Sequence, residues 1–285
     1  MSEAARPDVD GLNQMEASAI DGAVEWQGLG ASIFDDVPLV DAGCTSFILQ
    51  IGGGTSVTVE PRREAFDRTE VLSDDKLIGT GADACRMTGA LLWDSAVVLA
   101  SYVARNRKAL CGSSNHSMRA IELGAGLGLA GLAAAAALNA ETVLTDRSEC
   151  LPLLNQSIAL NGLATLASAA DLDWGDQAAA RALGRFHLVL LSDCIYEVDA
   201  CEPLAQTLAA LLADSGGQAL LTYDEAIGRP AAAASFRECA ARCGLVWEEL
   251  QQEQEDAASE EEALEAFTKG SVKLARLRLR SRDEG

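Results

Sequence analysis

The stretch from Ile121 to Gly131, IELGAGLGLAG, determines how the rest of the chain is interpreted. It starts as an apolar strand, passes through closely spaced glycines and continues into an alanine-rich helix. Its glycines form two overlapping patterns, GxGxG at Gly124, Gly126 and Gly128 and GxGxxG at Gly126, Gly128 and Gly131. Glycine lets the backbone approach a ligand closely, and a helix start offers unpaired N–H groups. The stretch therefore predicts a strand, a nucleotide-binding loop and a helix.

Strands and helices alternate from this loop to the C-terminus. Repeated βα units of this kind predict a largely parallel sheet covered on both faces. The last two strands are joined by an acidic connector without a clear crossover helix, so they are expected to pair antiparallel. The expected strands are 118–123, 141–146, 164–172, 185–193, 217–223, 245–250 and 271–280, and the expected helices are 128–139, 150–162, 201–214 and 230–244.

The chain ahead of this alternation divides into three parts. Residues 1–43 are rich in Asp, Glu, Ala and Gly without sustained periodicity, which predicts an acidic leader without fixed structure. Residues 45–61, TSFILQIGGGTSVTVEP, predict a β-hairpin around a glycine turn, and residues 89–110 have helical spacing. We therefore predict a leader at 1–43 and one domain at 44–285, which includes the hairpin and the acidic connector 251–267.

The composition is that of a globular protein able to bury a full core, since 49% of its 285 residues are hydrophobic. The formal charge of -21 opposes binding to phosphate backbones, so we expect no nucleic-acid partner. A partner with a basic surface fits this charge, although solubility alone also explains an acidic surface.

The cysteines and the N-terminus bear on location. Eight cysteines are scattered through the chain without a CxxC pair, which predicts free thiols and no metal site. The first residues lack the basic and apolar regions of a signal peptide, and no later run is long enough to cross a bilayer. We expect a cytoplasmic monomer that does not contact membranes.

Ligands of such sheets bind outside the carboxyl ends of the parallel strands, so these ends identify candidate site residues. They are the glycine loop, Asp146, the segment DLDWGD at 171–176 and the segment SDCIY at 192–196. Asp146 follows the loop by about 20 residues, the spacing at which an acidic side chain binds ribose hydroxyls. NAD and S-adenosylmethionine both contain a ribose, so at this point both cofactors remain open.

Five segments resemble, in order and spacing, the methyltransferase family 16 proteins. These are seven-β-strand enzymes that use S-adenosylmethionine, and many of them methylate lysine in other proteins. The resemblance implies an α/β, Rossmann-like, seven-stranded and mostly parallel sheet with the last strand antiparallel, and it favours S-adenosylmethionine over NAD. The segments are GALLWDSAVVLASYV, IELGAGLGLAGLAAA, VLTDRSECLPLLNQSIALNG, LDWGD and LVLLSDCIYEVDACEPLAQTL, within residues 89–208.

The resemblance also implies which residues contact the cofactor. Those at the glycine loop would meet the methionine end of the cofactor, Asp146 would bind the ribose, and Asp173 and Trp174 would contact the adenine. A tryptophan ahead of the first helix would close over the cofactor. The implied cofactor contacts are Trp93, Glu122, Gly124, Ala125, Gly126, Asp146, Asp173, Trp174 and Ser192.

The segment SDCIY resembles the Asp-x-x-Tyr motif of the family, which places Asp193 and Tyr196 at the acceptor as the catalytic pair. Around this motif the chain departs from the family, with Leu191 and Ser192 in place of small residues and Cys194 in place of an aliphatic one. A carboxylate at a strand end can also simply cap the next helix. The motif residues themselves are retained.

The sequence thus predicts a protein-lysine N-methyltransferase whose protein substrate has basic residues around an accessible lysine. Two other functions stay open. An NAD-dependent oxidoreductase is favoured only by GxGxxG, and its catalytic residue would have to come from a chain with two histidines, His116 and His187. A module that binds S-adenosylmethionine without catalysis would use the acidic surface to hold a basic partner.

Overall fold

A computed structural model gives the fold. It describes residues 14–20, 23–27, 46–52, 54–61, 89–111, 117–224, 230–250 and 272–281, the first two segments as backbone only. The acidic connector 251–267 lies outside the described residues, so the expectation that it contains no clear crossover helix stays a prediction.

A seven-stranded sheet with the order β10-β11-β9-β8-β5-β6-β7 forms the centre of the fold. The pairs from β7 through β6, β5 and β8 to β9 are parallel, while β11 pairs antiparallel with both β9 and β10. The predicted mostly parallel sheet with an antiparallel last strand is therefore confirmed. Its strands are β5 Arg119–Leu123, β6 Glu141–Asp146, β7 Ala167–Asp171, β8 Leu188–Ser192, β9 Gln218–Asp224, β10 Leu245–Glu249 and β11 Val272–Leu279.

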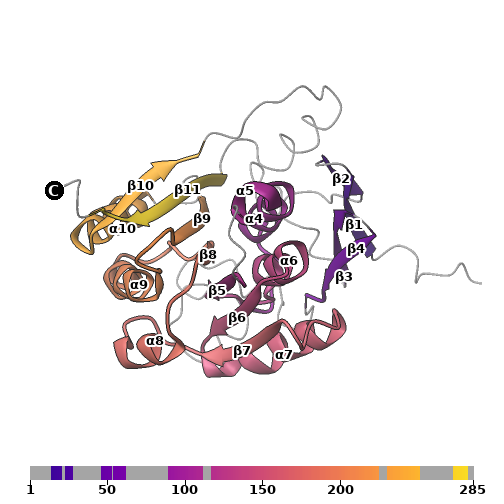
Figure 1. Cartoon of the computed structure of the whole chain (residues 1–285), viewed down its shortest axis with the longest axis horizontal. Coiled ribbons are helices and arrows are strands. Elements are labelled where there is room, and N and C mark those ends of the chain that lie inside the picture. The colour runs from indigo at the N-terminus through magenta and orange to yellow at the C-terminus, as the bar shows by residue number, and fades with distance from the viewer. Residues whose placement is uncertain are drawn as a thin grey trace, which may run out of the picture.

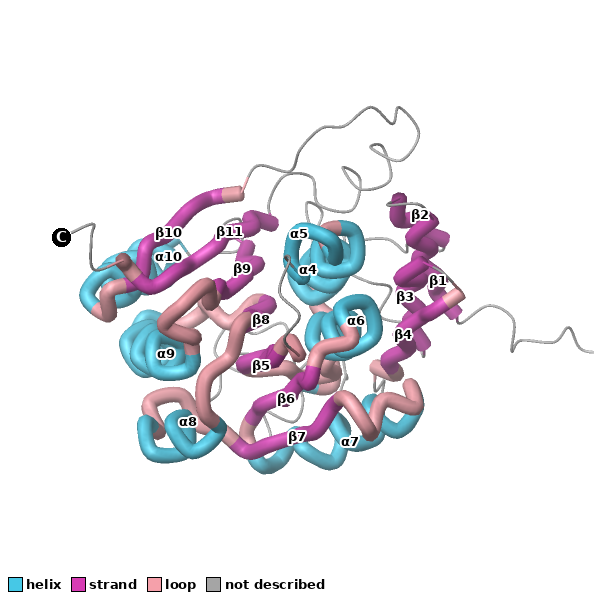
Figure 2. The backbone as a smooth tube through the Cα atoms, in the orientation of Figure 1, coloured by secondary structure: helices cyan, strands magenta, loops and turns pink. Residues whose placement is uncertain are grey.

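Helices cover both faces of this sheet (Figures 1 and 2). Side chains that alternate along each strand supply a separate apolar core on each side. On one face lie α4 Asp94–Arg105, α5 Arg107–Cys111, α6 Leu129–Leu138 and α7 Leu151–Leu160, which follows the short 3-10 helix η2 Ser148–Cys150. On the other face lie α8 Gln177–Leu183, α9 Val198–Leu211 and α10 Pro230–Arg242.

Local chemistry explains most of these helices. Helix α6 is apolar on all sides because it packs against the sheet, α4 and the N-terminal strands at once. The helix expected at 89–110 is divided in two, because the Asn106 side chain donates to the Tyr102 carbonyl at 2.9 Å and ends α4. Helix α8 was not predicted; Asp176 caps it by accepting bonds from two backbone N–H groups of its first turn.

The predicted hairpin is present as β3 Ser46–Gly52 and β4 Thr55–Val59. It belongs to a four-stranded sheet of order β2-β1-β3-β4, with β1 Gln14–Ile20 and β2 Ala23–Gln27. These two strands lie within residues 1–43, where the sequence predicted no fixed structure. The rest of that segment lies outside the described residues, so the boundary at residue 43 stays a prediction.

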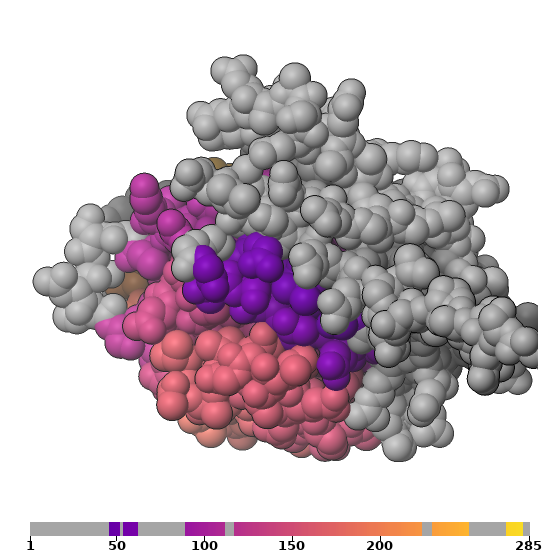
Figure 3. All heavy atoms as spheres, turned by 90° about the vertical axis from the view of Figure 1, so that its right-hand side faces the viewer, coloured from indigo at the N-terminus to yellow at the C-terminus, as the bar shows by residue number. Residues whose placement is uncertain are grey.

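The hairpin is attached directly to the main domain. The Asn161 side chain, just after α7, donates to the Thr58 carbonyl and accepts from the Thr58 N–H, both at 2.7 Å. Figure 3 shows the hairpin, in indigo, lying against the pink and salmon atoms of the main domain. A side chain that pairs with both backbone groups of a strand residue fixes the position of the hairpin.

Candidate active site

Three glycines with left-handed backbone shape the loop that follows β5. Gly124, Gly126 and Gly128 have φ angles of 61°, 53° and 79°, a region that other residues rarely adopt. The Ala125 N–H donates to the Thr145 carbonyl at 2.9 Å, which ties the loop to the end of β6. The path of the backbone therefore requires these glycines.

Protein atoms already occupy the space that side chains would need at two of them. A Cβ atom on Gly124 would lie 3.0 Å from the Trp174 ring and 3.1 Å from the Cys194 sulfur. A Cβ atom on Gly126 would lie 3.0 Å from the carbonyl oxygen of Gly89. The loop is thus packed between the segment that precedes α4 and the segments that follow β7 and β8.

Gly131, the third glycine of the GxGxxG pattern, packs between α6 and the sheet. In the first turn of α6, its Cβ atom would lie 2.1 Å from the Leu144 side chain and 2.8 Å from a Glu122 carboxyl oxygen. Glycine is needed at this position so that the helix can pack closely on the sheet, which is a structural role. The third glycine of the dinucleotide fingerprint has the same packing role, so Gly131 does not distinguish NAD from S-adenosylmethionine.

The Asp146 carboxyl, at the end of β6, holds the glycine loop in place. One of its oxygens accepts the Gly126 N–H and the other accepts the Arg147 N–H, each at 2.8 Å. Burial raises the pKa of Asp146, and these two hydrogen bonds oppose that rise. A carboxylate has about four acceptor positions, so Asp146 keeps acceptor capacity for ligand hydroxyls.

Glu122 is the most deeply buried acid of the site, with 0% of its surface exposed. Its Oε2 accepts the Gly131 N–H at 2.7 Å, while Oε1 has no hydrogen-bond partner among the residues that the structure describes. Burial raises the pKa of Glu122 to about 8, and the nearby Asp146 carboxyl adds to that rise. A buried, unpaired oxygen is costly, so its position calls for a functional explanation.

The Trp174 ring connects the glycine loop to the predicted acceptor motif. It is half-buried, it contacts the Gly124 backbone region, and its centroid lies 6.2 Å from that of Tyr196. The Gly175 N–H donates to the Thr207 hydroxyl at 2.8 Å, which fixes the Trp174 segment on α9. Asp173, by contrast, is exposed and lies 3.9 Å from the Arg147 side chain.

Asp193 follows β8 in a strained backbone conformation. Its φ of 53° lies in the left-handed region, and its N–H donates to the Thr222 carbonyl at 2.9 Å. Ser192 pairs with the same residue in the sheet, and the Cys194 thiol donates to the Leu123 carbonyl at 3.2 Å. Strained backbone in non-glycine residues persists where the surroundings enforce it, and such positions cluster at functional sites.

Two predicted residues lie at the rim of this site. Tyr196 is 38% exposed and faces Trp174 at an interplanar angle of 53°. Trp93 is the N-cap residue of α4, four positions after the Gly89 that packs on the loop. Gly89 and Cys194 complete the loop packing but were not predicted as site residues. Only the short spacing of Gly89 from Trp93 could have indicated its role.

A cleft of about 570 Å³ elsewhere does not compete with this site. It lies between α8, α9 and the end of α10, near the amino end of β8 and so away from the carboxyl ends of the strands. Arg181, Arg185 and Gln206 line it. Arg185 donates to the Leu212 carbonyl at the end of α9 and pairs with Asp214 at 3.0 Å. Arginines near the carboxyl end of a helix stabilise its terminal carbonyls, so Arg185 in this cleft has a role in the fold.

One edge of the sheet thus carries the left-handed glycine loop, the Asp146 carboxyl that holds it and the strained Asp193. A profile of the lysine methyltransferase family matches residues 73–236, which include all of these residues. The chain belongs to the lysine methyltransferase family. The match covers more than half of the chain, and the predicted family is thereby confirmed. S-adenosylmethionine is therefore the cofactor, as predicted.

Individual relatives differ in what they methylate. The chain is 36% identical over 129 residues to the protein N-lysine methyltransferase METTL21A of Mus musculus, covering 44% of this chain and 56% of that protein. It is 32% identical over 125 residues to the calmodulin-lysine N-methyltransferase of Arabidopsis thaliana, covering 42% and 40%. It is 32% identical over 128 residues to the histone-arginine methyltransferase METTL23 of Mus musculus, covering 44% and 48%. The chain spans about half the length of these relatives.

The residues of this lysine methyltransferase family member fit the cofactor. The Glu122 Oε1 lacks a partner within the described part of the chain, Asp146 keeps free acceptor positions, and the glycine loop brings bare backbone to the strand ends. A cation with ribose hydroxyls and an aromatic base suits such donors and acceptors. The individual contacts assigned from the sequence, from Trp93 to Ser192, stay predictions.

Proposed function

We propose that this chain is an S-adenosylmethionine-dependent protein-lysine N-methyltransferase with Asp193 and Tyr196 at the acceptor. The observation that carries the proposal is the left-handed backbone of Asp193 directly after β8. The next residue, Cys194, packs against Gly124 of the glycine loop, and Trp174 packs against the same glycine. The acceptor residues and the cofactor loop are thus adjacent through side-chain packing. Family membership and the lysine methyltransferases among the relatives support the same activity.

The chemistry places few demands on the protein. The bound cofactor supplies a sulfonium methyl group that is already a strong methyl donor, so alignment of the acceptor dominates catalysis. The fold provides that alignment, because Asp193 is fixed by its bond to Thr222 and Tyr196 is held against Trp174. These residues position an incoming side chain at the end of β8.

A lysine must be neutral to accept a methyl group, and its usual pKa is about 10.4. A carboxylate nearby stabilises the ammonium form, whereas removal from water destabilises it. We therefore assign Asp193 to holding and aiming the amine. The Tyr196 ring, half of a tilted aromatic pair with Trp174, offers a π face to the methylammonium product.

The substrate is a protein with basic residues around the target lysine. The rim of the site supports this, because Asp171, Asp173 and Asp199 are exposed on the segments that surround it. Opposite charge at a rim mainly accelerates encounter and is weakened by salt. We further propose a cytoplasmic location, since the six cysteines within the described residues are free thiols. A monomeric state is part of the same proposal. In that part of the chain no helix combines the length and apolarity that a membrane span requires.

Incubation of the purified chain with methyl-labelled S-adenosylmethionine and a cell extract tests the activity. We expect label in one or a few proteins, and lysine as the labelled residue after digestion and mass spectrometry. Label on arginine would instead favour the activity of the METTL23-like relative. Cofactor binding without any labelled protein would favour the binding module, and binding of NAD in place of S-adenosylmethionine would overturn the proposal.

A further inference from the structure

Glu122 stands out among the groups at the cofactor loop because its carboxyl is buried with only half of its hydrogen bonds made. Its exposed fraction is 0%, and its one hydrogen bond runs from the Gly131 N–H to Oε2 at 2.7 Å. The other oxygen, Oε1, has no partner within the described residues. A charged carboxylate in this position lacks the compensation that buried charges need.

The groups around Glu122 oppose its negative charge. The Asp146 carboxyl, at the end of the neighbouring strand β6, adds to the rise in the pKa of Glu122. Two further acids lie on elements around β5, Asp193 directly after β8 and the buried Asp94 at the start of α4. The Cys194 thiol is buried, and its pKa is raised well above the usual value, so it stays neutral. Helix α6, which covers Glu122, contains no titratable side chain and contributes only the Gly131 N–H and the positive end of its dipole.

We propose that the Glu122 carboxyl is protonated in the ligand-free chain and loses its proton when the cationic cofactor binds, so that cofactor affinity depends on pH through this one residue. The inference rests on the proposed function only in requiring that the site bind S-adenosylmethionine. Glu122 then acts as a positioning residue that becomes charged only when a compensating cation is present.

The sign of the effect follows from linkage. Burial holds the pKa of Glu122 at about 8 in the free chain, so most molecules carry the proton at pH 7. A cation in the site favours the ionised form and lowers that pKa. Affinity for the cofactor therefore rises with pH below 8, by at most about tenfold per pH unit for one linked proton, and levels off above it.

Isothermal titration calorimetry measures this proton directly. The full chain is titrated with S-adenosylmethionine at pH 7 in phosphate and in Tris, whose ionisation enthalpies differ, and the difference in binding heat gives the protons released. We expect about one proton per cofactor for the wild type. The amino group of the cofactor itself titrates near pH 8, and its contribution is common to all variants.

Two matched variants isolate the source of the proton. Glu122→Gln keeps the acceptor for the Gly131 N–H and should abolish the release while still binding the cofactor. Glu141→Gln makes the same chemical change at an exposed acid at the start of β6 and should release the wild-type number of protons. Circular dichroism confirms that both variants are folded.

Three results would overturn the inference. Wild-type binding without proton release would show that Glu122 stays protonated as a structural cap of α6. Equal release by wild type and Glu122→Gln would assign the proton to another group. Absence of any cofactor binding by the wild type would overturn the proposed function as well, which separates the two failures.

Discussion

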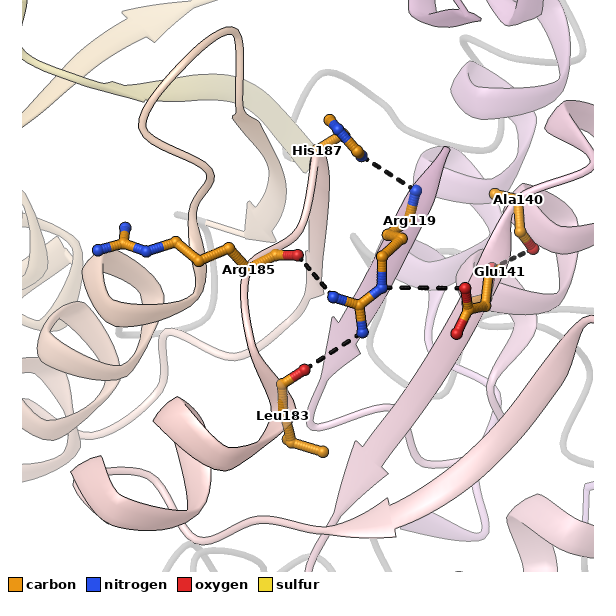
Figure 4. Close-up of polar contacts among 7 residues, drawn as sticks. Arg119, Ala140, Glu141, Leu183, Arg185 and His187 are labelled. Atoms are coloured by element: carbon orange, nitrogen blue, oxygen red, sulfur yellow. Dashed lines mark hydrogen bonds and ion pairs between the residues drawn. The ribbon is translucent and has the colours of Figure 1, made fainter. Parts of the chain in front are cut away.

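The two ends of β5 differ in whether their polar groups find partners within the protein. At its start, Arg119 donates to the carbonyls of Arg185 at 2.9 Å and Leu183 at 3.2 Å (Figure 4). Its guanidinium also lies 4.4 Å from the Phe186 ring centroid. Its backbone N–H donates to His187 Nδ1 at 3.1 Å. Other groups of the protein thus satisfy the polar groups of Arg119, so this end of the strand contributes to stability.

At the other end of the same strand, the polar groups are incompletely paired or the backbone is strained. Glu122 has an oxygen without a partner in the described chain, Gly124 and Gly126 have left-handed backbone, and Asp193 adopts the same conformation without being glycine. Only one other non-glycine residue of the described part, Asn139 after α6, shares it. Both ends belong to one buried strand, so burial alone does not distinguish structure from function. What distinguishes them is whether the protein supplies the partners.

The largest expected effect comes from Asp193→Asn. Asparagine tolerates left-handed backbone, so the variant should fold and bind S-adenosylmethionine with nearly wild-type affinity. Loss of the charge that aims the amine should lower kcat by about a hundredfold or more. Methyl transfer and calorimetric affinity are measured on the same preparation.

Asp214→Asn is the matched control, because this exposed acid pairs with Arg185 away from the site, and it should retain turnover. If Asp193→Asn loses affinity and turnover equally, Asp193 belongs to the cofactor site or to the fold. Wild-type turnover would remove it from the mechanism.

Asp146→Asn should chiefly weaken cofactor binding. Charge-assisted hydrogen bonds contribute about 1.5–3 kcal/mol each, so losing one predicts at least a tenfold rise in Kd. The amide also presents a donor to one of the two N–H groups that Asp146 accepts, which should loosen the glycine loop. Asp171, its neighbour in register on β7, is exposed, and Asp171→Asn should leave Kd unchanged. Equal Kd values for both variants would remove Asp146 from the site.

These contacts show what the sequence could and could not predict. The positions of Gly124, Asp146 and Asp193 follow from strand periodicity, because the carboxyl ends of parallel strands meet at one edge. The antiparallel last strand followed from the resemblance and from the long connector without a clear helix. In contrast, the packing of Gly89 on Gly126 joins segments with no shared pattern.

Short elements were missed for a related reason. The seven-residue α8 has an alanine-rich sequence without an amphipathic period, and its capping residue Asp176 lies in a segment that also ends a strand. Strands β1 and β2 lie in a region whose composition indicates disorder. Such elements depend on tertiary contacts that a single sequence does not display.

The buried acids at the carboxyl end of β5 should make the stability of the chain depend on pH. Burial raises the pKa of Glu122 to about 8 and also raises that of Asp146. Between the unfolded value near 4.5 and about 8, the folded chain holds more protons than the unfolded chain, so stability falls as pH rises through this window. One such group changes the free energy of unfolding by about 1 kcal/mol per pH unit.

Urea unfolding of the free chain between pH 5.5 and 8 measures this slope, with the pH range chosen to bracket the window of about 4.5 to 8. Glu122→Gln should flatten the slope, whereas Glu141→Gln should preserve it because that acid is exposed. A slope unchanged in Glu122→Gln would mean that the buried carboxyl does not control stability in this range.

Arg119→Gln tests the opposite end of β5 and should affect stability alone. Its ion pair with Glu141 is long, at 3.9 Å, and partly exposed, so that pair contributes little. The greater loss comes from the carbonyls of Arg185 and Leu183, which lose charged donors, and from the Phe186 ring, which loses its cation. Together these predict about 1–3 kcal/mol of destabilisation without a change in cofactor Kd.

Arg278→Gln provides the matched control, because Arg278 is exposed on β11 and should change stability by less than about 0.5 kcal/mol. Urea unfolding and calorimetric Kd are compared for both variants. A loss of affinity in Arg119→Gln as large as its loss of stability would show that the two ends of β5 are energetically coupled. The contrast between a stabilising end and a binding end would then fail. Unchanged Kd with reduced stability would confirm that the partners of Arg119 serve the fold alone.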